Sequence, residues 1–349
     1  MSRQMDDRTL ELEASINALY SRAVDEVREE FARFTEDFEA EDRRQSARVT
    51  EGEITPEEYA NWRQNNIIRS DRYQATVDSL TTMMVNADIA AMEITRGQLP
   101  IATAESYNFV QALGSAAAED AGLSMGTFQI YNADSVQAIL RDNRELLPYV
   151  DTEADEQWNH DRINREIVTG ILTGDSIPKI ADRLQGVTTM DRNAAVRNAR
   201  TAMTGAENLG RRESADRLRA QGLPMKEVWS ATYDSRTRDT HLMLDGTEAD
   251  ANGLFGVGIL TTPLRYPGDP LGDPGEVYNC RCRLNVQIGT IDHSNDADLY
   301  EQFMRDNYPE DYAALQDKRD EQQEAAKRRE ELLANQNQAA SIGKSSRSQ

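Results

Sequence analysis

Apolar residues in the first part of the chain recur in steps of three and four. Charged residues such as Glu26, Arg33 and their neighbours fill the positions between them. This 3.6-residue period predicts an amphipathic helix over residues 8–44. We expect the next helix of the same chain to cover its apolar stripe, because short loops favour antiparallel neighbours. The stripe consists of Ile16, Tyr20, Ala23, Val27, Phe31, Phe34 and Phe38.

The sequence predicts the start of a second helix at Thr55. Thr55 suits the N-cap, Pro56 suits the first helical position, and Glu58 completes a capping box. Apolar positions continue at helical spacing to Met92, and Gly97 and Pro100 predict the end of the helix. Residues 101–125 are rich in Ala, Ser and Gly, which favours a loop with a short helix.

Residues 134–222 carry the pattern of several further helices. We expect one at 136–140, one at 155–172, one at 176–184 that Gly186 closes, and a longer one at 191–220. Gly205 and Gly210 lie inside this last helix and each weakens it by about 1 kcal/mol relative to Ala. Close packing against a neighbour is therefore expected at both glycines.

The pattern changes to strict alternation at residue 223. Residues 227–233 alternate, and residues 281–288 place Cys282, Leu284, Val286 and Ile288 on one face. Both segments are predicted strands of one small antiparallel sheet. Between them we expect a polar loop at 234–241, a turn at 244–246, and an irregular Gly/Pro-rich loop over 252–276.

Together these elements predict an α+β chain that is predominantly α-helical, with long N-terminal helices and a small antiparallel β-containing module. Four segments are expected: an N-terminal helical arm (1–125), a helical part (126–222), the small module (223–290) and a charged, partly disordered C-terminal tail (291–349).

Composition narrows the class of function. The chain has 349 residues, of which 38% are hydrophobic and 29% charged, and its formal net charge is −22. Because phosphate binding is driven by Lys and Arg, this charge argues against strong direct nucleic-acid binding. Neither a signal segment nor an apolar run of the ~18 residues that span a membrane is present. We therefore expect a protein made in a cytosol that has no membrane partner.

The most specific motif lies in the small module. It reads Asp234-x-Arg236-Thr237-Arg238-x-x-His241, then Asp245-Gly246, and after the Gly/Pro loop Asn279-Cys280-Arg281-Cys282. This combination resembles the phage head-morphogenesis family, the phage Mu F-like minor head proteins. Three helical stretches, 174–181, 199–201 and 206–208, are similar as well. The resemblance covers roughly residues 126–290.

The resemblance implies a structural minor head (capsid) protein of a bacteriophage, and not an enzyme. It implies a location in the virion, inside the head, with the host cytoplasm as the site of assembly. The partners it implies are the portal protein, the major capsid protein or both, and the role is in head assembly, DNA packaging or delivery. Relatives with a toxin or transferase activity carry it in an added C-terminal domain, and residues 291–349 are too polar for one.

The cysteines leave two interpretations open. Some relatives have a Cys-x-x-Cys pair and a His-x-x-Cys-Arg-Cys ending, whereas here Arg238 and Val277 replace a Cys and a His, and His241 replaces the second Cys of the pair. His241, Cys280 and Cys282 remain as ligands that could hold zinc together with an Asp or water. The favoured interpretation is that both cysteines are small core residues, so that no cofactor is expected.

The same residues allow two alternative functions. A His beside carboxylates and arginines could cleave a phosphodiester, which would make the chain a metal-dependent nuclease or processing enzyme centred on His241, Cys280 and Cys282. The other alternative is a zinc-stabilised protein-interaction module. We favour a loop braced by ion pairs, because the motif contains a single His and no second acid–base group at a recognisable spacing.

Overall fold

The computed structural model describes residues 2–68, 71–120, 136, 139–141, 143–146, 151–173, 175–288, 327–329 and 331. It divides into two compact units. Unit 1 comprises residues 1–97 and 148–199, and unit 2 comprises residues 98–147 and 200–349. Two long helices, α3 (Asp71–Asp120) and α6 (Ile177–Ala220), contribute to both units. The fold is α+β and predominantly helical, as predicted.

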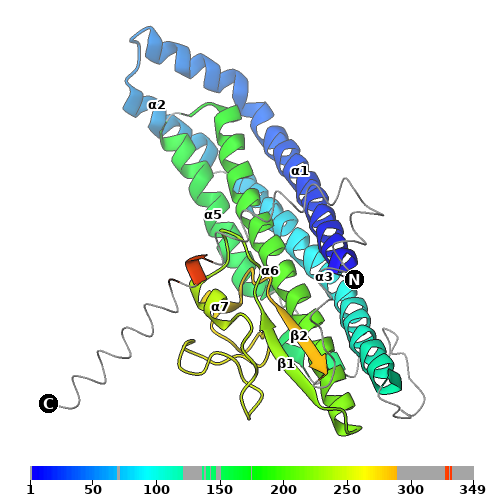
Figure 1. Ribbon diagram of the computed structural model, residues 1–349. Coiled ribbons are helices and arrows are strands. Elements are labelled where there is room, and N and C mark those ends of the chain that lie inside the picture. Colours follow the sequence, from blue (N-terminus) through cyan, green and yellow to red (C-terminus); the bar gives the residue numbers. More distant parts are fainter. Residues whose placement is uncertain are drawn as a thin grey trace, which may run out of the picture. The chain divides into compact units, whose positions relative to one another are not determined.

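Unit 1 is built from helices around one apolar core. Helix α1 (Ser2–Thr50), drawn in blue in Figure 1, carries the predicted stripe, which is buried from Ile16 to Phe34. The stripe packs against residues of α3, α5 (Thr152–Leu172) and α6, so the chain itself covers it, as expected. The buried residues of this core are Val27, Phe31, Phe34, Tyr73, Val77, Leu80, Met84, Ile163, Ile167, Ile171, Ile180 and Leu184.

The capping box at Thr55 is present. The backbone N–H of Glu58 donates to Thr55 Oγ1 at 3.1 Å, and the N–H of Thr55 donates to Glu58 Oε2 at 2.8 Å. The helix that it starts is shorter than predicted: α2 (Pro56–Arg63) leads into a π-helical turn, η1 (Gln64–Ile68), and α3 then begins at Asp71.

Two predicted helix ends are wrong. Gly97 and Pro100 lie inside α3, and Gly186 lies inside α6. Pro100 removes one backbone donor, but the helix is retained because Leu99 beside it is fully buried. The loop expected at 101–125 is therefore helical as far as Asp120, and residues 121–125 lie outside the described residues. The helix expected at 136–140 is described only at 136, 139 and 140, which are helical.

Unit 2 contains the predicted sheet. Strand β1 (Met225–Ser230) pairs antiparallel with β2 (Arg283–Ile288), with Trp229 opposite Leu284 (Figure 1). The chain between them holds two short helices, α7 (Asp239–Leu244) and α8 (Pro274–Val277). The end of the predicted polar loop is thus helical. A 3-10 turn, η2 (Arg144–Leu146), also belongs to this unit.

Close packing at the two glycines of α6 is confirmed. A Cβ atom at Gly205 would lie 2.8 Å from the carbonyl oxygen of Gly268, and one at Gly210 would overlap the carbonyl oxygen of Thr103. Only glycine lets the backbones approach this closely. Helix α6 thereby becomes the platform on which the irregular loop and β2 lie.

The division of the chain into four segments, 1–125, 126–222, 223–290 and 291–349, remains a prediction. The disorder expected in the tail falls on residues that lie outside the described ones. Among the helices that the structure describes, none combines the length and apolar character that crossing a lipid bilayer requires.

Candidate functional site

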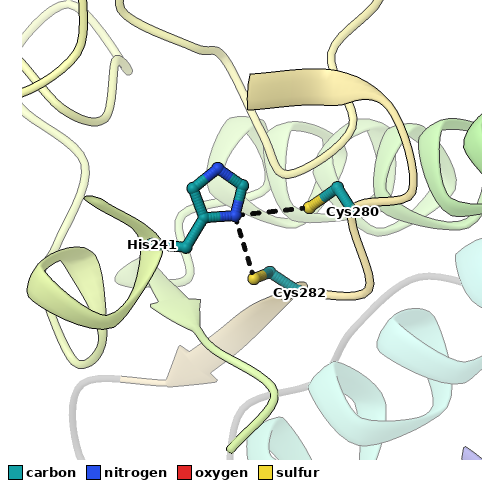
Figure 2. A group of neighbouring side chains, drawn as sticks. All are labelled: His241, Cys280 and Cys282. Atoms are coloured by element: carbon teal, nitrogen blue, oxygen red, sulfur yellow. Dashed lines mark hydrogen bonds between the residues drawn. The ribbon is translucent and has the colours of Figure 1, made fainter. Parts of the chain in front are cut away.

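Three of the predicted residues meet in unit 2. His241 on α7 turns its Nδ1 towards Cys280 and Cys282, which precede β2 (Figure 2). The Cys280 Sγ lies 3.7 Å from Nδ1 and the Cys282 Sγ lies 3.4 Å from it. The three ligand atoms lie within 4.8 Å of one another, and the three residues are only 1–2% exposed.

The His241 ring is held from two other sides. Its Nε2 lies 3.1 Å from Glu276 Oε2 of α8, a carboxylate that also accepts a hydrogen bond from Thr240 Oγ1 at 2.9 Å. The indole of Trp229 on β1 meets the ring edge-on, with centroids 5.1 Å apart. This environment favours the tautomer with its proton on Nε2, which leaves the Nδ1 lone pair facing the two sulfurs.

Helix α6 positions the cysteine segment through backbone contacts. Thr204 Oγ1 donates to the carbonyl of Cys280 at 2.9 Å, and Asn208 Nδ2 donates to the carbonyl of Cys282 at 3.1 Å. Asn279 adopts a left-handed φ of 55°, and its N–H donates to Thr201 Oγ1 at 3.1 Å. The turn at Asn279 directs both sulfurs into the interior.

The Cys280 and Cys282 thiols influence each other's pKa. The hydrogen bond with Cys282, together with burial, raises the pKa of the Cys280 thiol. The same bond, together with the one to His241, lowers the pKa of Cys282 against the opposing effect of burial. The contact between the two sulfurs thus moves their pKa values in opposite directions.

Asp234 and Arg281 form an ion pair beside this group. Arg281 Nη2 donates to Asp234 Oδ1 at 2.7 Å, and Nη1 donates to Oδ2. The guanidinium holds the pKa of the Asp234 carboxyl well below its usual range. Arg281 is thus engaged in an ion pair within the chain. This pair braces the polar loop that starts at Asp234, which is the kind of contact expected from the sequence.

The remaining motif residues support the backbone. Thr237 donates to the carbonyl of Thr232, and Arg238 Nη2 donates to the carbonyl of Tyr278 at 2.6 Å. Arg236 is exposed.

Asp245 and Gly246 close the turn after α7. Asp245 accepts from the N–H of Ala231 at 2.8 Å and from the Tyr233 hydroxyl at 2.5 Å. Gly246 has a left-handed φ of 71°, and its N–H donates to the carbonyl of Trp229 at 2.8 Å. These residues set the position of α7 relative to β1.

Glu276 and Thr204 were missed by the sequence reasoning. Glu276 stands four residues before Cys280, so an acidic residue close to a cysteine pair was the signal that could have identified it. Thr204 lies on a helix far away in sequence, and no local pattern marks it.

The chemistry open to this group follows from its donors and its burial. Two sulfurs and an imidazole nitrogen are the ligand types that zinc prefers. Because all three side chains are buried, none of them presents a nucleophile or a base to a large substrate.

Comparison with known proteins gives matches over part of the chain. Residues 161–285 match the family described as Phage Mu protein F like protein. The minor head protein GP7 of Bacillus phage SPP1 is 28% identical over 171 residues, which is 47% of this chain and 52% of that protein. The NAD(+)–arginine ADP-ribosyltransferase EFV of Enterococcus faecalis is 31% identical over 121 residues, or 34% of this chain and 24% of that protein.

The match thus spans about half the length of the first of these relatives and about a quarter of the second. No solved structure matches the chain. The matched residues 161–285 contain α6, β1, the first half of β2 and the whole group around His241. Through this segment the chain is similar to the phage Mu F-like proteins, the resemblance that its motifs indicate.

Proposed function

We propose that this protein is a structural minor head protein of a bacteriophage. The observation that carries the proposal is the match of residues 161–285 to the phage Mu F-like family, with the similarity to a minor head protein beside it. The protein is incorporated in the virion, inside the head, after assembly in the host cytoplasm. It acts there in head assembly, DNA packaging or delivery.

The partners in this proposal are the portal protein and the major capsid protein. A net charge of −22 opposes contact with packaged DNA, so protein contacts hold the molecule in place. The stripe of α1 is already buried within unit 1 and does not supply the partner surface. Contacts with the head must therefore use the outer faces of the molecule.

The geometry of the motif supports a role without catalysis. His241, Cys280 and Cys282 are buried, and Asp234 is bound to Arg281. The similarity to the ADP-ribosyltransferase extends over 24% of that enzyme. These observations favour a structural role of the motif over that of a nuclease or processing enzyme.

Mass spectrometry of purified phage particles tests the location. We expect the protein in particles, and we expect it to co-purify with portal protein from infected cells after nuclease has removed all DNA. Finding it only free in the cytosol, or bound to particles solely through DNA, would contradict the proposal.

A nuclease assay tests the enzyme alternative separately. Purified protein with added Mg²⁺, Mn²⁺ or Zn²⁺ should leave duplex and single-stranded DNA intact. If it degrades DNA, and His241→Gln abolishes the degradation while the circular dichroism spectrum is unchanged, the enzyme interpretation replaces the structural one.

A further inference from the structure

We propose that His241, Cys280 and Cys282 bind one zinc ion that fastens α7 to the start of β2. The proposal concerns the internal architecture of unit 2 and does not depend on the role in the phage head. It rests on the spacing of the three donor atoms, on the environment of His241, and on the segment that the site would close.

The spacing fits a tetrahedral ion. Bond lengths of about 2.3 Å for Zn–S and about 2.0–2.1 Å for Zn–N place a sulfur and a nitrogen about 3.6 Å apart at the corners of a tetrahedron. The two Sγ–Nδ1 distances are 3.7 and 3.4 Å. An ordinary core cysteine faces hydrocarbon, whereas here one imidazole nitrogen lies between two sulfurs (Figure 2).

A carboxylate lies close to the second ring nitrogen of His241, as it does beside many metal-bound histidines. Such a histidine donates its second ring N–H to a carboxylate, which fixes the tautomer and the ring orientation. Glu276 Oε2 lies 3.1 Å from Nε2 and is thus close enough to be that carboxylate, although the angles of a hydrogen bond are not met. Thr240 holds that carboxylate with a hydrogen bond of 2.9 Å.

The donor set selects the metal and its role. Thiolate and imidazole favour zinc over Mg²⁺ or Ca²⁺, which prefer oxygen ligands. Among the described residues, no further His, Cys, Asp or Glu joins the three, so a water molecule completes the tetrahedron. Binding displaces the thiol protons. Three protein donors and a water are also the pattern of catalytic zinc, but side chains that are 1–2% exposed admit no large substrate, so we assign the ion a structural role.

The site would close a long irregular segment. His241 is separated from Cys280 by 39 positions and from Cys282 by 41. The chain between them contains left-handed glycines at 246, 253, 256, 258 and 268 and little regular structure. A crosslink at its two ends lowers the conformational entropy of the unfolded chain, and a metal clip gains most where the closed loop is long.

Zinc content of the full-length protein tests the site. The protein is expressed with added zinc, purified without a histidine tag, and measured by inductively coupled plasma mass spectrometry. We expect one zinc per chain, and loss of most of it in Cys280→Ser, Cys282→Ser and His241→Asn. The matched control is His160→Asn, at a half-buried histidine of α5 in unit 1, which should keep the full zinc content.

A milder variant keeps the test valid if these substitutions prevent folding. Glu276→Gln leaves all three ligands in place and should weaken zinc binding about 10–100-fold. Cobalt substituted into the wild-type protein should give the thiolate charge-transfer band and the visible bands of a tetrahedral site.

Two results would overturn the proposal. One is wild-type protein that contains no zinc while both thiols remain reduced and titratable after unfolding. The other is zinc that persists at one per chain in the folded Cys280→Ser and Cys282→Ser variants.

Discussion

The buried guanidinium of Arg63 holds both carboxylate oxygens of Asp42, with Nε–Oδ1 and Nη2–Oδ2 distances of 2.7 and 2.8 Å. Its remaining nitrogen, Nη1, donates to the carbonyls of Ile171 and Asp175 at 3.3 and 3.0 Å. One side chain therefore connects α1, α2 and the end of α5 within unit 1. No apolar pattern in the sequence distinguishes this arginine from the exposed ones.

Removing one partner of this pair should destabilise unit 1 strongly. Asp42→Ala leaves the guanidinium buried without its counter-charge, a change that costs about 3–5 kcal/mol. Denaturant unfolding followed by circular dichroism measures the loss. Arg43→Ala, at a side chain that is 74% exposed and pairs with Glu39, should change stability by less than about 0.5 kcal/mol. Equal losses of stability in Asp42→Ala and Arg43→Ala would contradict the conclusion that the Asp42–Arg63 pair is buried and stabilising.

The stability of unit 1 should fall as the pH rises from mildly acidic values to about 8. Asp191 is 8% exposed, and burial, with the nearby carboxylates of Asp88 and Asp155, raises its pKa to about 8 against the opposing charge of Arg162. Burial likewise raises the pKa of Asp88, which accepts from the Tyr20 hydroxyl, to about 6. The folded state thus keeps protons that the unfolded state releases near pH 4, so the free energy of unfolding falls as the pH rises from about 4 to about 8 and levels off above that.

Asp191→Asn should remove most of this pH dependence, because an amide stays neutral. Thermal melts at pH 5.5 and pH 9 measure the difference, and the variant should be the more stable protein at pH 9. Asp78→Asn, at a side chain that is 70% exposed on α3, should keep the wild-type profile. A wild-type protein that is more stable at pH 9 than at pH 5.5 would refute the prediction.

Two glycines of α6 should respond oppositely to alanine. At Gly210 the new Cβ would overlap the carbonyl oxygen of Thr103, and overpacking of this kind costs about 1–3 kcal/mol. At Gly186 no atom lies within 4 Å of the new Cβ, so the helix should gain about 0.5–1 kcal/mol. Chemical denaturation of both variants tests this, and a stabilised Gly210→Ala would show that the helices are not in close contact there.

Two arginines near Asp234 should differ in their contribution to unit 2. Arg281→Ala removes the two hydrogen bonds that the partly buried carboxylate accepts, and should cost about 1–3 kcal/mol. Arg236 lies 3.7 Å from the same carboxylate but is 73% exposed, so Arg236→Ala should be nearly neutral. Thermal unfolding and limited proteolysis between residues 245 and 279 measure both effects. A larger loss of stability in Arg236→Ala than in Arg281→Ala would contradict the conclusion that Arg281 is the partner of Asp234.

The local pattern of residues was enough to predict much of the secondary structure and the family resemblance of this protein. The stripe from Ile16 to Phe38 predicted α1, because a periodic apolar face is a property of the residues themselves. The Thr55 capping box and the two alternating segments needed only neighbours within a few positions. The motif from Asp234 to Cys282 was sufficient to indicate the family.

Tertiary structure decided where the helices end and what the motif residues touch. Gly97, Pro100 and Gly186 cost an isolated helix about 1–3 kcal/mol each, but burial of the residues beside them outweighs that cost. The approach of His241 to two cysteines about 40 positions away depends on how α6, β1 and β2 pack, and so does the place of Glu276 behind the imidazole. Such contacts have no local signature, because their free energy arises only when distant segments are folded together.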